Sequence, residues 1–182
     1  MNINKIDLAN NSKVYLIDNF LDETHLQIAH DLCDTYYSNR EDWEQPDWTK
    51  HRYVYKGGGE KFKKIWQYFG LEGIADVFDS IVDKDKNFID LQLWCDLPNI
   101  PILDPHIEAG AYLGQLYITK SIDSQYPIHG TSIYNDNKQL LFTMPYRNNF
   151  CWFFDKCTSV MHGRNCEVPK GLERFSFLFR YE

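Results

Sequence analysis

The sequence predicts an α+β domain in which helices near the N-terminus pack against one sheet of a β-rich C-terminal half. Two observations lead to this prediction. Segments within residues 19–83 carry apolar side chains at helical spacing, whereas residues 88–181 hold many short, aromatic-rich segments separated by turn residues. Helices followed by strands are typical of α+β folds, and many short strands indicate a sandwich, barrel or jelly roll rather than a parallel sheet.

Length and composition favour one globular domain. The chain has 182 residues, of which 43% are hydrophobic and 16% aromatic, so it can build one sizeable core but hardly two. We therefore expect a single domain over residues 1–182. In it, residues 1–83 form a mainly helical N-terminal support and residues 84–182 form the jelly-roll core.

Charge and cysteine content exclude several classes of function. The net charge of −7 argues against nucleic-acid binding, which depends on Lys and Arg. The first 20 residues lack the apolar core of a signal peptide, and no segment is long and apolar enough to cross a membrane. The five cysteines are odd in number and form no C-x-x-C pair, which indicates reduced thiols. We expect a cytoplasmic protein with no membrane contact.

Three helices are expected, over residues 19–38, 60–70 and 71–83. Asp22 is placed to cap the first of them, and Gly70 stands where the second should end. Their apolar stripes are typical of core residues rather than of a cofactor site. The segment between the first two helices, residues 39–59, is rich in Trp, Tyr and Gly and is either a lid or a surface loop.

Six strands are expected, over residues 88–94, 112–119, 131–134, 139–144, 150–154 and 174–181. In the last strand the alternation is clear. One face carries Arg174, Ser176, Leu178 and Arg180, and the other carries Phe175, Phe177, Phe179 and Tyr181. The aromatic face needs a cover, which the helices can supply, so the opposite face should point into the jelly roll.

The segment "HIE" places His106 and Glu108 on the same side of an extended chain. With a second imidazole, they make a two-His-one-carboxylate triad, which holds one face of Fe(II) and leaves three coordination positions open. His162, in "VMHG", is the natural third ligand. The remaining histidines are read as ordinary polar residues.

Twelve residues after His162, the segment "RFS" places Arg174 and Ser176 on one strand face. A guanidinium and a hydroxyl side by side are suited to hold a carboxylate. A dicarboxylate such as 2-oxoglutarate can chelate iron at one end and be held there at the other.

Together these motifs resemble the Fe(II)/2-oxoglutarate-dependent oxygenases, in particular their small prolyl-hydroxylase-like members. The resemblance covers most of the chain: "VYLIDNFLDETHLQIAHDLC" is similar to the entry strand and first helix, "HIE" to the H-x-D/E motif, and "SVMHG" with "ERFSF" to the distal part of the site. It implies a double-stranded β-helix fold, a relative of the jelly roll. It also implies Fe(II), with 2-oxoglutarate and O₂ as co-substrates.

The resemblance also guides the choice among rival residues. In the family the carboxylate follows the His, which favours Glu108 over Asp104, although Asp is the usual ligand. Asp104 would then orient His106 through its free ring nitrogen. Lys170 is a rival to Arg174, because some branches use a Lys at a nearby offset. The resemblance suggests Tyr117 as a further member of the 2-oxoglutarate pocket.

One departure concerns the turn before the segment with the distal His. Asn149 stands there in place of the family's usual glycine, and Asn also tolerates unusual backbone angles.

The expected function is therefore hydroxylation of a C–H bond, with release of succinate and CO₂. The substrate is a peptide or protein, with prolyl residues as one option, or a small molecule. Halogenating relatives lack the carboxylate ligand, so a related desaturation is a closer alternative than halogenation. A second class is a non-catalytic jelly roll that binds a sugar, a peptide or a protein partner, which would suit the surplus of aromatic residues.

Overall fold

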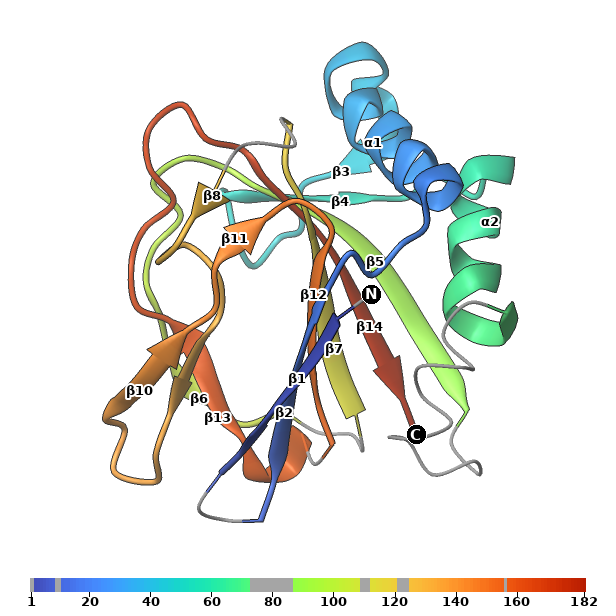
Figure 1. Ribbon diagram of the computed structural model, residues 1–182. Helices are drawn as coiled ribbons and strands as arrows, with labels where there is room; N and C mark the ends of the chain where they lie inside the picture. Colours follow the sequence, from blue (N-terminus) through green and yellow to red (C-terminus); the bar gives the residue numbers. More distant parts are fainter. Residues whose placement is uncertain (1, 9–10, 73–86, 109–111, 121–124, 156) are drawn as a thin grey trace.

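The computed structural model describes residues 2–8, 11–72, 87–108, 112–120, 125–155 and 157–182. They form two antiparallel sheets that face each other, with two helices outside the larger sheet (Figure 1). The larger sheet runs in the order β1 (Asn2–Asp7), β2 (Lys13–Asp18), β12 (Phe150–Phe154), β7 (Tyr112–Ile118), β14 (Arg174–Tyr181), β5 (Phe88–Asp96), β4 (Arg52–Tyr55) and β3 (Trp43–Glu44).

The smaller sheet runs in the order β10 (Leu140–Thr143), β9 (Ser132–Tyr134), β13 (Met161–Arg164) and β6 (Leu103–His106). A separate pair of short strands consists of β8 (Gln125–Tyr126) and β11 (Tyr146–Arg147). Neighbouring strands are mostly far apart in sequence, because the chain crosses repeatedly between the two layers. The predicted jelly-roll architecture is confirmed.

All six strands expected from the sequence are present, as β5, β7, β9, β10, β12 and β14, and β14 has the predicted bounds. The strands β6, β8, β11 and β13 were not expected. Each has only two to four residues, too few for an alternating pattern to stand out from the surrounding loop. They depend on pairing with partners elsewhere in the chain.

Helix α1 (Glu23–Ser38) begins where the sequence predicts. The Asp22 carboxylate accepts a hydrogen bond of 2.8 Å from the backbone N–H of His25, so it satisfies one of the free donors at the helix start. The expected stripe buries Ala29, Cys33 and Tyr36. This face lies on the larger sheet, on the side away from the smaller one (Figure 1).

Helix α2 (Glu60–Gln67) continues into a π-helical turn, η2 (Tyr68–Glu72). The helical segment therefore continues past Gly70, the expected end, at least as far as Glu72. The third expected helix, over residues 71–83, lies from residue 73 onward outside the described residues.

The aromatic face of the last strand is covered by these helices, as predicted. Its four aromatic side chains are buried in one cluster with Tyr36 of α1 and with Ile65 and Phe69 of the second helical segment. Each such burial stabilises the fold by about 1.5–3 kcal/mol. The apolar stripe of the second helical segment is not buried throughout: Trp66 is 37% exposed and lies at the rim of the cluster, where its ring is 4.7 Å from that of Phe88.

The N-terminal support is less helical than expected, because residues 1–83 also supply β1 to β4 of the larger sheet. Segment 39–59 is not a simple loop: it contains a short 3-10 helix, η1 (Arg40–Asp42), as well as β3 and β4. The strand β4 exists because it pairs with β5, where Arg52 lies opposite Asp96. That long-range pairing leaves no local signature in the sequence.

Asn149 adopts a left-handed backbone with φ of 54°, as its place in the expected turn requires. Its side chain accepts a hydrogen bond of 2.7 Å from the N–H of Leu21 and donates one of 2.9 Å to the Leu21 carbonyl. Asn149 thus joins the turn before β12 to the segment that leads into α1. Among the helices in the described ranges, none has the length and apolar character that crossing a bilayer requires.

Candidate active site

A cavity of about 370 Å³ opens between the two sheets. Its walls combine aromatic and charged side chains: Trp48, Trp94 and Trp152, the arginines Arg52, Arg164, Arg174 and Arg180, and the three expected metal ligands His106, Glu108 and His162. The inward face of β14 contributes Arg174, Leu178 and Arg180, as the alternation of the last strand predicts. The volume is typical of sites for small molecules.

The three expected metal ligands come together at one end of this cavity. His106 ends β6 and His162 lies in β13, and the antiparallel pairing of the two strands sets these residues directly opposite each other. Glu108 follows two residues after His106. One ligand atom from each of the three side chains lies within 4.8 Å of the other two.

Gly163 allows the two strands to approach this closely. A Cβ at this position would lie 2.4 Å from the carbonyl oxygen of Leu103 on β6, a contact that real side chains do not make. The register shifts at this point of the pairing, between His162 and Arg164. The glycine next to the distal His therefore has a steric role in bringing the two imidazoles together.

Backbone carbonyls fix the orientation of both imidazole rings. Nδ1 of His162 lies 3.1 Å from the Val160 carbonyl oxygen, and Nδ1 of His106 lies 2.8 Å from that of Asp104. A carbonyl can only accept, so we assign the proton to Nδ1 in each ring. The lone pair is then on Nε2, and Nε2 of His106 points toward Glu108, 3.7 Å from Oε1.

The protonation states suit a divalent metal. Burial lowers the pKa of His162, which favours its neutral form. The nearby imidazole of His106 lowers the pKa of Glu108, which favours the ionised carboxylate. The same contact raises the pKa of His106, so a metal bound there would have to displace a proton from Nε2. Two imidazoles and an ionised carboxylate are the donor set of the Fe(II) facial triad, so these residues fit the ion.

The alternative carboxylate, Asp104, does not join this group in the described part of the chain. Its residue is exposed, and its backbone carbonyl rather than its side chain contacts His106. The expected orienting role of Asp104 is thus performed by the main chain.

Glu108 has a second partner that the sequence reading did not assign. Oε2 of Glu108 accepts a hydrogen bond of 3.0 Å from Nη2 of Arg180, on the inward face of β14. The signal was present, because Arg180 shares a strand face with Arg174. Only the fold shows that Glu108 lies within reach.

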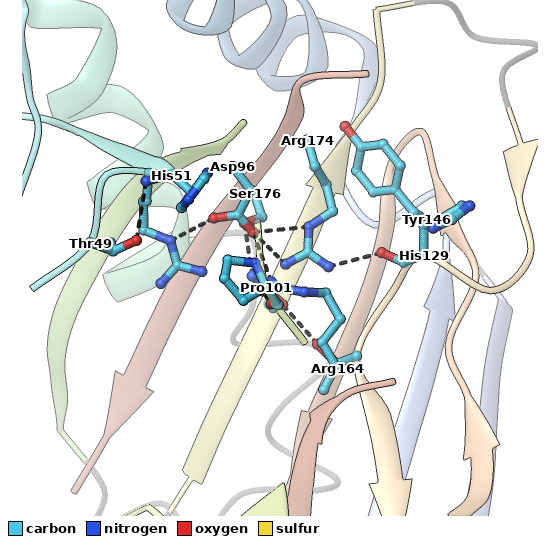
Figure 2. A network of polar contacts seen from close by, with 12 residues as sticks. Thr49, His51, Asp96, Pro101, His129, Tyr146, Arg164, Arg174 and Ser176 are labelled. Atoms are coloured by element: carbon cyan, nitrogen blue, oxygen red, sulfur yellow. Dashed lines mark hydrogen bonds and ion pairs between the residues drawn. The ribbon is translucent and has the colours of Figure 1, made fainter. Parts of the chain in front are cut away.

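Arg174 meets a carboxylate of the protein itself. Asp96, at the end of β5, is fully buried and lies opposite Arg174 on one side and Arg52 on the other. Arg174 contacts Oδ2 of Asp96 at 3.1 Å from Nε and 2.6 Å from Nη2, and its Nη1 donates to the His129 carbonyl at 2.9 Å. Figure 2 shows this cluster, with Arg164 on the side facing Pro101.

Arg174 nevertheless keeps capacity for a ligand. A guanidinium has five N–H donors, and three of them make the contacts to Asp96 and His129, which leaves two. Lys170, the rival expected from sequence, is exposed and does not line the cavity.

The other two expected 2-oxoglutarate contacts lie behind the cavity wall. Ser176 accepts a hydrogen bond of 2.7 Å from Gln115, and neither Ser176 nor Tyr117 lines the cavity. The Tyr117 hydroxyl accepts from the N–H of Thr131 at 2.8 Å and from the indole of Trp152 at 3.0 Å. Gln115 and Thr131 stand in their place at the cavity surface.

No family model and no curated protein matches this sequence, whereas several solved structures do. An oxidoreductase of the 2OG-Fe(II) oxygenase family from Burkholderia pseudomallei matches with a TM-score of 0.64 and 12% identity, over 93% of this chain and 84% of that one. The chain has the fold of the Fe(II)/2-oxoglutarate oxygenases. The double-stranded β-helix expected from the resemblance is confirmed.

Two further structures with this oxygenase fold carry ligands. A prolyl hydroxylase from Trichoplax adhaerens, in complex with a hypoxia inducible factor peptide fragment, matches with a TM-score of 0.61 and 12% identity, over 92% of this chain and 82% of that one. HygX from Streptomyces hygroscopicus, with nickel, 2-oxoglutarate and hygromycin B bound, matches with a TM-score of 0.62 and 12% identity, over 92% and 82%.

Four residues of this oxygenase-fold site were missed as site residues from the sequence: Asp96, Arg52, Arg164 and Arg180. Asp96 is a charged residue that ends a strand of otherwise alternating pattern, a weak signal for an inward-facing group. Arg52 lies in the segment read as a lid or loop. Their association around one carboxylate depends on strand pairings that connect distant parts of the chain.

Proposed function

We propose that this protein is an Fe(II)- and 2-oxoglutarate-dependent dioxygenase that hydroxylates a C–H bond of its substrate and releases succinate and CO₂. The observation that carries the proposal is the cluster of His106, Glu108 and His162 at the end of a cavity, on a fold shared with such enzymes. Fe(II) held by these ligands would activate O₂ and couple its reduction to the oxidative decarboxylation of 2-oxoglutarate.

The residues of the chain bind and orient the reactants. The carbonyl partners of His106 and His162 keep both Nε2 atoms available, and Arg180 holds the Glu108 carboxylate. Arg174 offers its two remaining N–H donors to the distal carboxylate of 2-oxoglutarate. It is 3% exposed, so this contact would be made away from bulk water and be stronger for it.

The substrate is a peptide or a small molecule. Both options have a parallel among the similar structures, one of which holds a peptide fragment and another hygromycin B. Nucleic acid is disfavoured by the net charge of −7. A carboxylate ligand at position 108 favours hydroxylation or desaturation over halogenation, for which the coordination position of the carboxylate must be free.

The test is spectroscopic and needs no substrate. Anaerobic addition of Fe(II) and 2-oxoglutarate should produce a weak visible metal-to-ligand charge-transfer band in the wild-type protein and none in His162→Ala. Lys170→Gln, which lies outside the cavity, is the matched control and should keep the band. A wild-type protein without the band would contradict the proposal and would favour the non-catalytic binding module, for which the three tryptophans of the cavity provide a surface.

Turnover tests the second half of the proposal. Panels of peptides and of small molecules can be screened in air for succinate release. Members of one of the two panels should increase it. A chlorinated product in chloride buffer would contradict the assignment of Glu108 as a ligand.

A further inference from the structure

The cavity is more positive than the protein that surrounds it. The arginines Arg52, Arg164, Arg174 and Arg180 line it, and they face two carboxylates, Asp96 and Glu108. Four positive and two negative charges give a formal charge of +2, in a chain whose net charge is −7. Charges of one sign between low-dielectric walls focus the field and draw in anions.

The proposed metal and co-substrate do not remove this excess. Fe(II) carries two positive charges and 2-oxoglutarate carries two negative charges, so a site loaded with both keeps the same formal charge of +2. The remaining reactant, the primary substrate, is the group that can neutralise it.

Arg164 has donor capacity that the protein does not use. Its side chain is 5% exposed, and within the described ranges its buried Nε has no hydrogen-bond partner. Nη2 donates to the Pro101 carbonyl, and Nη1 lies 3.5 Å from Asp96.

Arg52, like Arg164, uses only part of its hydrogen-bond donor capacity within the protein. Its Nε donates to Oδ1 of Asp96 at 2.6 Å, and its two terminal nitrogens make no hydrogen bond to any described residue. The guanidinium lies 3.7 Å over the ring of Trp94 and 5.3 Å from that of Trp48, both of which line the cavity. Such stacking fixes the plane of the guanidinium and leaves its edge for a ligand.

We propose that the primary substrate is a small acid whose carboxylate or phosphate binds to Arg52 and Arg164, with its apolar part against Trp48 and Trp94. The inference rests on the proposed function and narrows the substrate to one class. Arg174 remains assigned to 2-oxoglutarate, as under the proposed function, since it still has two N–H donors beside its contacts to Asp96 and His129. A guanidinium pair distinguishes an acid from its amide, since only the acid accepts charge-assisted hydrogen bonds.

The experiment measures binding of probes to the protein loaded anaerobically with Fe(II) and 2-oxoglutarate. The probes are benzoate, phenyl phosphate and benzamide, followed by calorimetry. Benzoate or phenyl phosphate should bind about tenfold or more tightly than benzamide, and the better of the two identifies the anion. This comparison uses the wild-type protein alone, so it does not depend on whether any variant folds. Equal binding of benzoate and benzamide, or no binding of either anion, would overturn the inference.

Variants locate the anion site. Arg164→Met and Arg52→Met should each weaken binding of the anionic probe by about tenfold, while Arg147→Gln should not. Arg147 lies on β11, forms an ion pair with Asp18 and does not line the cavity, so it controls for the loss of one arginine. If both variants instead lower the affinity for 2-oxoglutarate and leave the probes unaffected, the two arginines belong to the co-substrate and the inference is wrong.

Failure of the inference and failure of the proposed function are distinguishable. The charge-transfer band reports on the metal and 2-oxoglutarate, whereas calorimetry with benzoate, phenyl phosphate and benzamide reports on the anion site and can be repeated on protein without metal. A band without selectivity for anions would overturn the substrate class only. Anion selectivity without a band would contradict the proposed function and leave an anion-binding site.

Discussion

Arg180 and Glu108 form an ion pair of 3.0 Å that joins the last strand of the larger sheet to the segment that carries two of the candidate metal ligands. The pair fixes one carboxylate oxygen and leaves the other facing His106. Groups that hold a ligand in this way tune metal affinity without touching the metal. Loss of the arginine would free the glutamate to turn away.

We therefore expect Arg180→Met to lower Fe(II) affinity by about 10–100-fold. Arg180→Lys should restore part of the affinity, because an ammonium keeps the charge but not the planar geometry. Titration with Fe(II) or Co(II) measures the effect, and thermal melting checks that both variants fold. Equal affinity in Arg180→Met and the wild type would show that the ion pair has no role in orienting Glu108.

A pair of single variants separates the two candidate carboxylates. Glu108→Gln should lose nearly all Fe(II) binding and turnover, because the amide supplies no charge to the metal. Asp104→Asn should stay close to the wild type, since only its main-chain carbonyl contacts His106. The reverse order in an Fe(II) titration would assign the metal to Asp104.

Replacement of Arg174 should affect the co-substrate more than the metal. Arg174→Gln removes a buried, charge-assisted contact, and a loss of this kind costs about 2–5 kcal/mol by analogy with interfaces. The apparent KM for 2-oxoglutarate should rise strongly while Fe(II) affinity changes little. Lys170→Gln is the matched control and should leave KM unchanged. A large effect of this variant would mean that Lys170, not Arg174, binds the distal carboxylate of 2-oxoglutarate.

Asp96 should set the acid stability of the fold. The cost of its burial is outweighed by Arg52 and Arg174, which hold the pKa of its carboxyl far below the usual value. The unfolded chain therefore takes up this proton first as the pH falls, near pH 4. The stabilisation is complete above that pH and declines as the pH falls toward the folded pKa.

Asp96→Asn should accordingly destabilise the protein at neutral pH by about 3–5 kcal/mol, because three buried arginines lose their common carboxylate. The unfolding free energy of the variant should also depend less on pH between about pH 5 and pH 2. Urea unfolding at several pH values measures both effects. A variant as stable as the wild type at pH 7 would show that the arginines find other partners.

Tyr117→Phe distinguishes a structural role from a role in co-substrate binding. The hydroxyl accepts hydrogen bonds from two buried donors, the Thr131 N–H and the Trp152 indole. Because Phe would leave both donors without an acceptor, the free energy of unfolding should fall by about 1–3 kcal/mol. Because Tyr117 does not line the cavity, KM for 2-oxoglutarate should not change. A raised KM with unchanged stability would favour the reading of Tyr117 as a pocket residue.

The sequence by itself determined the parts whose signals are local. The alternation in residues 174–181 shows which side chains face the helices and which face the cavity, because a strand has a period of two. The capping Asp22 and the stripe through Tyr36 likewise mark α1, since capping and helical spacing act within a few residues. The pair His106 and Glu108 is a local signal too, because alternate residues of an extended chain lie on one side. His162, in contrast, is far away in the sequence, and its choice as the third ligand rested on the order of the motifs and the resemblance to the oxygenases.

Only the tertiary structure decided what the long-range pairings bring together. The strands β4, β6 and β13 are too short to be stable alone and exist because they pair with distant partners. Asp96 meets Arg52 across one pairing and Arg174 across another, and Glu108 meets Arg180 from the opposite sheet. The sequence separations are 44, 78 and 72 residues. The sequence gives the chemistry of each side chain. Which residues contact each other across such sequence separations depends on how the whole fold packs.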